Sequence, residues 1–113
     1  MSIKLEGYDI YFNVDSYKYG DGLALQLLYK DEDAILPYAM LTVNLEEFST
    51  YGNKAFVDIN NLGDEILQWI EDNNIGIQTS RLGFSGFCIY PEVEFNMEEI
   101  NKHLIGGKEN EQI

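Results

Sequence analysis

The sequence predicts a small single α+β domain over residues 1–105, built from an antiparallel β-sheet with two helices packed on one side. Several segments alternate apolar and polar residues with the two-residue period of a strand. Two other segments repeat apolar residues with the period of an amphipathic helix. Glycine, asparagine and charged residues separate these segments, as is typical of turns. A chain of 113 residues with 45% hydrophobic residues is long enough for one modest core, and we expect residues 106–113 to form a flexible tail.

Strands are expected wherever the apolar residues alternate. The alternation in residues 3–14 changes phase at Gly7, which predicts a bulge or turn there. Pro37 cannot donate to a β-ladder, so its strand is expected to lie at a sheet edge or to contain a bulge. The predicted strands are 3–14, 23–30, 34–45, 55–59 and 87–95, the last being one strand or two broken at Pro91. The segments 16–22, 31–33 and 46–54 are expected to be turns or loops.

Two helices are expected. The first covers residues 60–74, with Asn60 or Asn61 as its cap. Its apolar stripe consists of Leu62, Ile66, Leu67, Trp69 and Ile70, and its opposite face carries Asp64, Glu65, Gln68, Glu71 and Asp72. The second covers residues 96–104, with Asn96 as its cap and Met97, Ile100 and Leu104 pointing inward.

The charge balance narrows the classes of partner. Twenty acidic residues face seven basic ones, which gives a formal charge of −13. Direct binding to nucleic acid or to an anionic membrane is not expected, because phosphates attract Lys and Arg. There is no apolar run long enough to span a membrane and no apolar signal segment at the N-terminus. Cys88 has no second cysteine to pair with, so we expect a location in a reducing cytoplasm.

Catalytic motifs are incomplete, and we expect a protein that is not an enzyme. Residues 83–87 resemble the nucleophile elbow G-x-S-x-G, but Phe87 occupies the place of the last glycine. A nucleophilic Ser85 or Cys88 would need His103, the only histidine, together with an orienting acid. The structural alternative is that residues 81–90 form a turn and a strand. Gly83 and Gly86 would then permit the turn, Phe87, Ile89 or their neighbours would enter the core, and Arg81 would pair with a carboxylate.

No cofactor or metal is expected. Residues 58–69 begin like an EF-hand loop, but Leu62 stands at the fifth position and Trp69 replaces the bidentate glutamate at the twelfth. One cysteine and one histidine cannot form a structural zinc site. The phosphate-binding patterns GK[ST] and G-x-G-x-x-G are absent.

The acidic residues gather in clusters with few basic neighbours, and two interpretations are open: a solvated surface that aids solubility, or a negative surface that attracts a basic partner. Exposed tyrosines are also typical of protein interfaces, although strands favour tyrosine for their own stability. The candidate partner-binding residues are Asp31, Glu32, Asp33, Glu46, Glu47, Asp64, Glu71, Asp72, Glu92, Glu94, Glu98, Glu99, Tyr17 and Tyr19.

Residues 55–95 resemble a family of short acidic proteins known only as a domain of unknown function. The matching positions are Asp58, Asn60, Asn61, Arg81, Gly83, Ser85, Gly86, Phe87, Tyr90 and Pro91. The resemblance implies no activity and no catalytic residues. It does imply a setting, since members occur on plasmids, integrative elements and prophages of Firmicutes and related bacteria.

Together, the charge and this setting predict a non-enzymatic inhibitor from a phage or mobile element. It would bind a basic host protein, such as a Cas nuclease or a restriction component, and block the groove that holds nucleic acid. The alternative is a small interaction module of a mobile-element complex, whose acidic residues serve only solubility.

Overall fold

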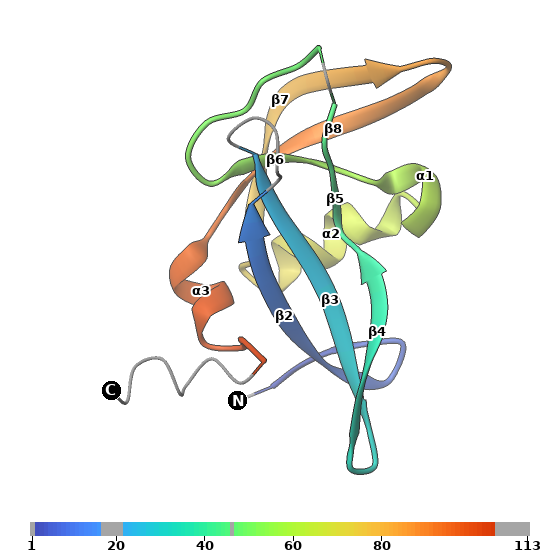
Figure 1. The fold of residues 1–113 in the computed structure, drawn as a ribbon, viewed down its shortest axis with the longest axis vertical. Helices are drawn as coiled ribbons and strands as arrows, with labels where there is room; N and C mark the ends of the chain where they lie inside the picture. The colour runs from blue at the N-terminus through green and yellow to red at the C-terminus, as the bar shows by residue number, and fades with distance from the viewer. Residues whose placement is uncertain (1, 17–21, 46, 106–113) are drawn as a thin grey trace.

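A computed structural model describes residues 2–16, 22–45 and 47–105. Within these residues the chain forms two four-stranded antiparallel sheets and three short helices (Figure 1). The predicted α+β class and the antiparallel pairing are therefore confirmed. The finer prediction of one sheet with two helices is wrong, because the chain changes sheet at Leu41 and the first predicted helix divides at Gly63. The predicted tail, residues 106–113, lies outside the described residues.

The first sheet has the strand order β1-β2-β3-β4 and the second has the order β5-β6-β8-β7. The strands are β1 (Ile3–Leu5), β2 (Tyr8–Ser16), β3 (Leu23–Asp31), β4 (Ala34–Met40), β5 (Thr42–Val43), β6 (Lys54–Val57), β7 (Gly76–Ser85) and β8 (Cys88–Phe95). The helices are α1 (Ile59–Leu62), α2 (Glu65–Asp72) and α3 (Met97–Asn101).

Two features of the first sheet follow the sequence closely. Leu5 pairs with Tyr8, and the two residues between them both have positive φ angles, 53° for Glu6 and 84° for Gly7. This is the conformation of a tight hairpin turn, so the phase change at Gly7 marks the boundary between two strands. Pro37 lies in β4, an edge strand, beside a register shift in the β3–β4 pairing. Both predicted consequences of Pro37 are confirmed.

Leu41 connects the two sheets. Its N–H donates to the carbonyl of Leu25 in β3 (2.9 Å), and its carbonyl accepts from the N–H of Asp58 at the end of β6 (3.0 Å). One fully buried residue is thus bonded to both sheets, and the predicted strand 34–45 divides there into β4 and β5. The two sheets and the helices share one core, whose largest fully buried side chains include Phe12, Phe56, Phe95, Leu25, Leu27 and Ile70.

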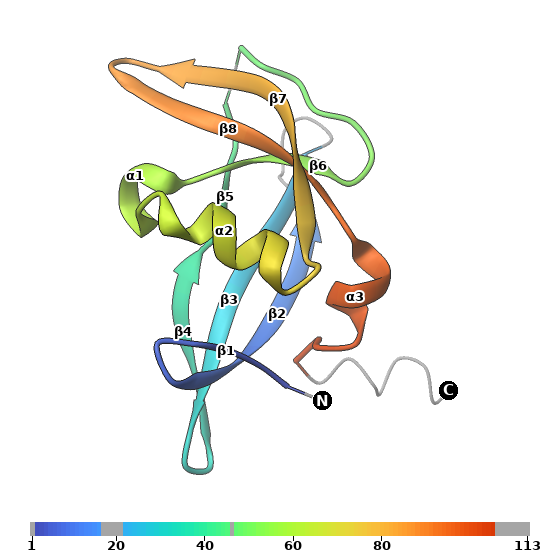
Figure 2. The same ribbon diagram turned by 180° about the vertical axis from the view of Figure 1, so that it is seen from behind.

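Helix α2 covers one face of the first sheet (Figure 2). Ile66 and Ile70 are buried in the core, and the indole N–H of Trp69 donates to the carbonyl of Lys4 in β1 (2.7 Å). The predicted apolar stripe is confirmed, but the helix is interrupted because Gly63, with φ of 90°, ends α1. The cap of α1 is Asp58, whose carboxylate accepts from the N–H of Asn61 (3.2 Å). The prediction of Asn60 or Asn61 as the cap is therefore wrong.

Helix α3 is capped as predicted, because the Asn96 side chain accepts from the N–H of Glu99 (3.3 Å). Ile100 is buried beneath it. Residues 103–105 then run along the edge of β2 beyond the residues that pair with β1. The N–H of Phe12 donates to the carbonyl of His103 (2.8 Å), and the N–H of Ile105 donates to the carbonyl of Phe12 (2.9 Å).

Strand β7 was not predicted. Residues 81–86 were expected to form a turn, but they continue a ten-residue strand that pairs with β8. Most of β7 is exposed, so its sequence lacks the apolar–polar alternation of a half-buried strand. The turn is confined to Gly86 and Phe87, between Ser85 and Cys88, which pair with each other. Gly86 has φ of 60°, so its predicted role in the turn is confirmed.

Two further expectations for this hairpin are wrong. Phe87 and Ile89 are exposed and do not enter the core. Gly83 lies within β7, opposite Tyr90, and not in the turn. Of the two alternatives for residues 87–95, the single strand is confirmed, because β8 continues through Pro91 without a break. Pro91 is tolerated because β6 pairs with β8 only from Phe56 to Lys54, opposite residues 92–94, so Pro91 has a neighbouring strand on the β7 side alone.

Close packing explains Gly83. A β-carbon at this position would lie 2.5 Å from Cδ1 of Leu45 and 2.9 Å from Cε1 of Phe56. We expect Gly83→Ala to lower the free energy of unfolding by about 1–3 kcal/mol, the usual cost of overpacking. Urea denaturation measures the change. Ser85→Ala, an exposed position two residues along the same strand, is the control and should change it by less than about 0.5 kcal/mol. Equal stability of the two variants would contradict this account of Gly83.

Candidate functional site

The acidic face of α2 is exposed, as the sequence predicts. Asp64, Glu71 and Asp72 all lie on the surface, and no basic residue occupies the last turn of the helix. Glu71 accepts a hydrogen bond from the N–H of Gln78 (3.4 Å), and Asp72 accepts one from the amide of Gln68 (2.8 Å). Negative charge at this end opposes the helix dipole, so the local structure alone does not favour these acids.

The other exposed acids lie on separate elements. Asp31 ends β3, and Glu32 and Asp33 form the turn to β4, at the end of a long projecting hairpin (Figure 1). Glu94 is exposed on β8 and Glu98 on α3. The negative surface is therefore distributed over several parts of the molecule. Three candidate residues, Glu46, Tyr17 and Tyr19, lie outside the described residues.

Glu99 is a candidate residue with bonds inside the domain. Its carboxylate lies 3.3 Å from Nζ of Lys102 and 3.3 Å from Nε2 of His103, and it is only partly exposed. The hydrogen bond from His103 and the neighbouring Lys102 ammonium hold the pKa of Glu99 below its usual value of 4.5. Glu99 therefore stabilises the end of α3, and its contacts leave it less available to a partner than Glu98.

Glu92 is not a surface residue. Its side chain is only 4% exposed, and its carboxylate accepts from the hydroxyl of Thr79 (2.6 Å) and from Nη1 of Arg81 (3.0 Å). The prediction that Glu92 forms part of the partner-binding surface does not suit this burial. The prediction that Arg81 pairs with a nearby acid is confirmed. The same Nη1 atom also donates to the carbonyl of Ser49 (2.6 Å).

A bulge in β7 brings these groups together. Gln78 pairs with Val93 and Leu82 pairs with Pro91, so three residues of β7 face the single residue Glu92. Ser80, in the middle of the bulge, has φ of 80°, which L-residues rarely adopt. The extra residues allow both Thr79 and Arg81 to point toward Glu92, as bulges commonly redirect side chains. The guanidinium of Arg81 also lies 5.3 Å from the centre of the Phe56 ring.

Beyond the bulge, residues 82–91 form a hairpin that we call the arm. Figures 1 and 2 both show it extending past the rest of the second sheet. Leu82, Phe84 and Ile89 are each 44–49% exposed, and Phe87 at the turn is fully exposed. Leu82 pairs with Pro91 and Phe84 with Ile89, so Leu82, Phe84 and Ile89 share one face of the hairpin. The arm contains no charged residue, in a chain in which 24% of residues are charged.

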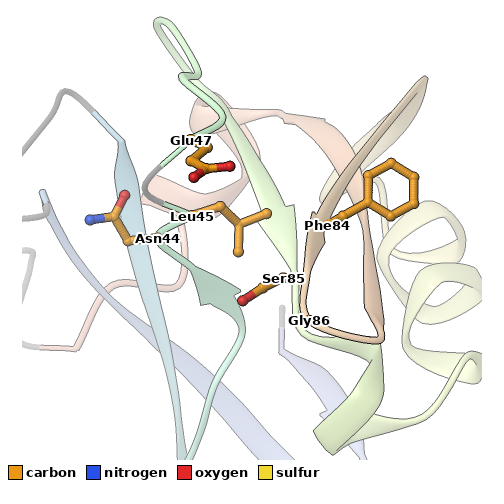
Figure 3. Close-up of a pocket in the computed structure, with 6 residues that line it drawn as sticks. All are labelled: Asn44, Leu45, Glu47, Phe84, Ser85 and Gly86. Carbon is orange, nitrogen blue, oxygen red and sulfur yellow. The ribbon is translucent and has the colours of Figure 1, made fainter.

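A hollow of about 480 Å³ lies between the arm and the segment that follows β5 (Figure 3). Leu45 and Ser85 point into this space, Glu47 lies at its border, and the Phe84 ring extends away on the other side of the hairpin. Phe84 is steadied by Phe48, whose ring centre is 6.1 Å from its own. On the far strand, the amide of Asn60 in α1 donates to the carbonyl of Ile89 (3.1 Å).

The tyrosines of the first sheet support one another. The rings of Tyr8 and Tyr29 lie 4.7 Å apart, and those of Tyr29 and Tyr38 lie 6.0 Å apart. This packing agrees with a role in sheet stability. In the arm, burial and a hydrogen bond with Cys88 raise the pKa of Tyr90 above 10.0, so its phenol stays protonated at neutral pH.

The structure does not bring together the residues of a nucleophilic triad. Ser85 and Cys88 flank the turn of the arm, whereas His103 is buried just after α3, and Figure 1 shows α3 on the opposite side of the molecule from the arm. Asp58, the first residue of the segment that resembles an EF-hand, caps α1. Among the described residues there is no group of three or more His, Cys, Asp or Glu side chains that could hold a metal ion. No helix in the described ranges is both long and apolar enough to span a bilayer.

The chain belongs to the family described as a domain of unknown function, DUF4313, whose profile matches residues 11–110. This match covers most of the chain, well beyond residues 55–95, on which the sequence resemblance rested. Neither the curated proteins nor the solved structures contain a match.

The exposed apolar residues of the arm were not predicted from the sequence, because Phe87 and Ile89 were expected in the core. One signal was present: residues 82–91 form an uncharged stretch in a strongly acidic chain. A stretch of this kind is a core strand in most proteins, so the exposure of its apolar residues required the structure.

The Arg81–Glu92 pair predicts that removing the arginine lowers the free energy of unfolding more than neutralising the glutamate does. Arg81→Met leaves a buried carboxylate whose one remaining partner among the described residues is Thr79, and we expect a loss of about 2–4 kcal/mol in the free energy of unfolding. Glu92→Gln leaves an arginine that is 43% exposed and that water can solvate, so its loss should be nearer to about 1 kcal/mol. Urea denaturation compares the two.

The control for this pair is Lys4→Met, which breaks the exposed ion pair between Lys4 and Asp9 and should change stability little. If Arg81→Met costs no more than this control, the Arg81–Glu92 contact does not hold the hairpin.

Glu99 predicts a pH dependence. Because the pKa of Glu99 is lower in the folded protein than in the unfolded chain, its ionised carboxylate stabilises the fold at pH values above the ordinary pKa of 4.5. This stabilisation is lost as the pH falls through the pKa of Glu99 in the folded protein. Glu99→Gln should therefore be less stable than the wild-type protein near pH 7 and nearly equal to it at about pH 2–3. Thermal unfolding across this range measures the difference. Glu98→Gln removes the same charge from the same turn but keeps the contacts with Lys102 and His103. Identical pH profiles for the two variants would contradict the assignment.

Proposed function

We propose that this protein acts without catalysis, by binding a basic protein through its exposed carboxylates. The observation that carries this proposal is the acidic face of α2, where Asp64, Glu71 and Asp72 are exposed and no basic side chain offsets the last turn. The three acids at the β3–β4 turn add a second negative surface. Complementary charge of this kind accelerates encounter with a basic partner and selects against acidic ones.

The partner class that we favour is a bacterial defence protein with a groove for nucleic acid, such as a Cas nuclease or a restriction enzyme. Such a groove is lined with Lys and Arg, and carboxylates can occupy the positions of phosphates. The formal charge of −13 supports this assignment. The resemblance of the sequence to proteins from mobile elements also supports it, since mobile elements gain from inhibiting host defence.

Inhibition of DNA cleavage tests the proposal. Purified Cas9 with its guide and a purified restriction endonuclease would each cleave target DNA in the presence of increasing amounts of the protein. We expect inhibition of at least one enzyme, and weaker inhibition as salt rises, because salt screens charge attraction between exposed groups.

Two reversal variants locate the surface. One changes Asp64, Glu71 and Asp72 to Lys, and the other changes Asp31, Glu32 and Asp33 to Lys. Both alter the net charge by the same amount, so each is the matched control of the other. We expect the α2 variant to lose at least about tenfold in inhibition, and the turn variant to lose less. Retention of full inhibition by both variants, each folded by circular dichroism, would contradict the charge-based mechanism.

A further inference from the structure

The arm differs from the rest of the surface in both charge and polarity. Four large apolar side chains, Leu82, Phe84, Phe87 and Ile89, are exposed on ten consecutive residues without a charge. Scattered apolar residues are normal on a protein surface, but a contiguous group on a projecting hairpin is typical of an interaction site. We refer to these four side chains as the arm face.

The arm face is held in place from several sides. The Arg81–Glu92–Thr79 contact fixes the base of the hairpin, and Gly83 packs closely on Leu45 and Phe56. Asn60 donates to the carbonyl of Ile89, and Phe48 packs against Phe84. A surface ordered in this way loses little conformational entropy on binding.

The charges around the arm indicate the chemistry of its partner. Glu47 borders the hollow on the side of the hairpin away from the Phe84 ring (Figure 3), and the charge of Asp58, just after β6, acts on Tyr90 of the arm. A second copy of this chain would bring another charge of −13 to the same surface, and an anionic membrane would also be repelled. The acids at the border of the arm instead suit Lys or Arg.

The shape of the arm indicates that its partner has a pocket. Phe87 stands at the turn of a projecting hairpin with its whole side chain exposed. Aromatic side chains of this kind contribute most to binding when they enter a desolvated pocket on the partner. We propose that the arm inserts Phe87 and its neighbours into an apolar pocket of a partner protein, where Lys or Arg residues around the pocket meet Glu47 and Asp58. This inference rests on the proposed function and identifies the part of the surface that anchors the partner.

An amino-substituted β-cyclodextrin is a suitable probe, because it offers an apolar cavity bordered by ammonium groups. Amide and aromatic NMR shifts would be followed during titration of the wild-type protein. We expect the largest shifts at Phe84, Phe87 and Ile89, and at least about tenfold weaker binding by Phe87→Ser. The Phe87 side chain is fully exposed, so this variant should fold normally. Unmodified β-cyclodextrin should bind more weakly than the amino form.

The matched control is Tyr51→Ser, which removes another highly exposed aromatic ring and should leave binding unchanged within about twofold. Loss of binding in Tyr51→Ser but not in Phe87→Ser, or no binding by the wild-type protein, would overturn the assignment of the arm. Equal affinity for both cyclodextrins would overturn the basic border while leaving the nuclease test of the proposed function unaffected.

Two other kinds of partner for the arm, a second copy of this chain and a membrane, would give different results. Sedimentation velocity would detect a dimer that Phe87→Ser abolishes, and pelleting with phosphatidylcholine vesicles would detect insertion into a membrane. Either result would overturn the proposal of a protein pocket. A monomer that does not pellet with vesicles supports it.

Discussion

The contact of Glu92 with Arg81 and Thr79 determines how the second sheet is built. Glu92 is the first residue of β8 that pairs with β6, and residues 88–91, which precede it, pair with β7 alone. A buried carboxylate at this position requires partners, and the bulge in β7 supplies them. Buried ion pairs contribute little net stability compared with apolar packing, but they penalise every arrangement that separates them. The contact thus fixes the register of β7 against β8 and the point at which the arm leaves the sheet.

The distribution of charge then follows from the architecture. Most of the exposed candidate acids lie on the outer face of α2, at the β3–β4 turn and at the start of α3, where the fold does not require burial. The arm projects from the opposite end of the molecule from the β3–β4 turn (Figure 2), and it carries no charge. The acidic surface and the uncharged apolar arm would affect different steps of binding. Charge attraction speeds the encounter with a partner, whereas burial of an aromatic side chain slows dissociation.

Local features of the fold could be predicted where one residue type has one physical consequence. Gly7 marked a turn, Pro37 marked an edge strand with a bulge, and the apolar stripe of α2 marked its buried face. The prediction failed where tertiary contacts decide. Nothing in the order of residues shows that Asp58 would cap α1 in place of Asn60, or that the strand through Leu41 would bend from one sheet to the other.

The same distinction applies to the candidate site. Exposure of the acids on α2 followed from helical periodicity. Glu92 and Glu94 are alike in sequence, but they differ in burial because the bulge in β7 brings Thr79 and Arg81 onto Glu92. The most direct test of this account is the mobility of the arm in the free protein, measured by ¹⁵N relaxation of the amides of residues 82–90. An ordered arm predicts order parameters of about 0.85, as in a rigid sheet. Values below about 0.6 would show a flexible hairpin and contradict the claim that Glu92 and its partners hold it in place.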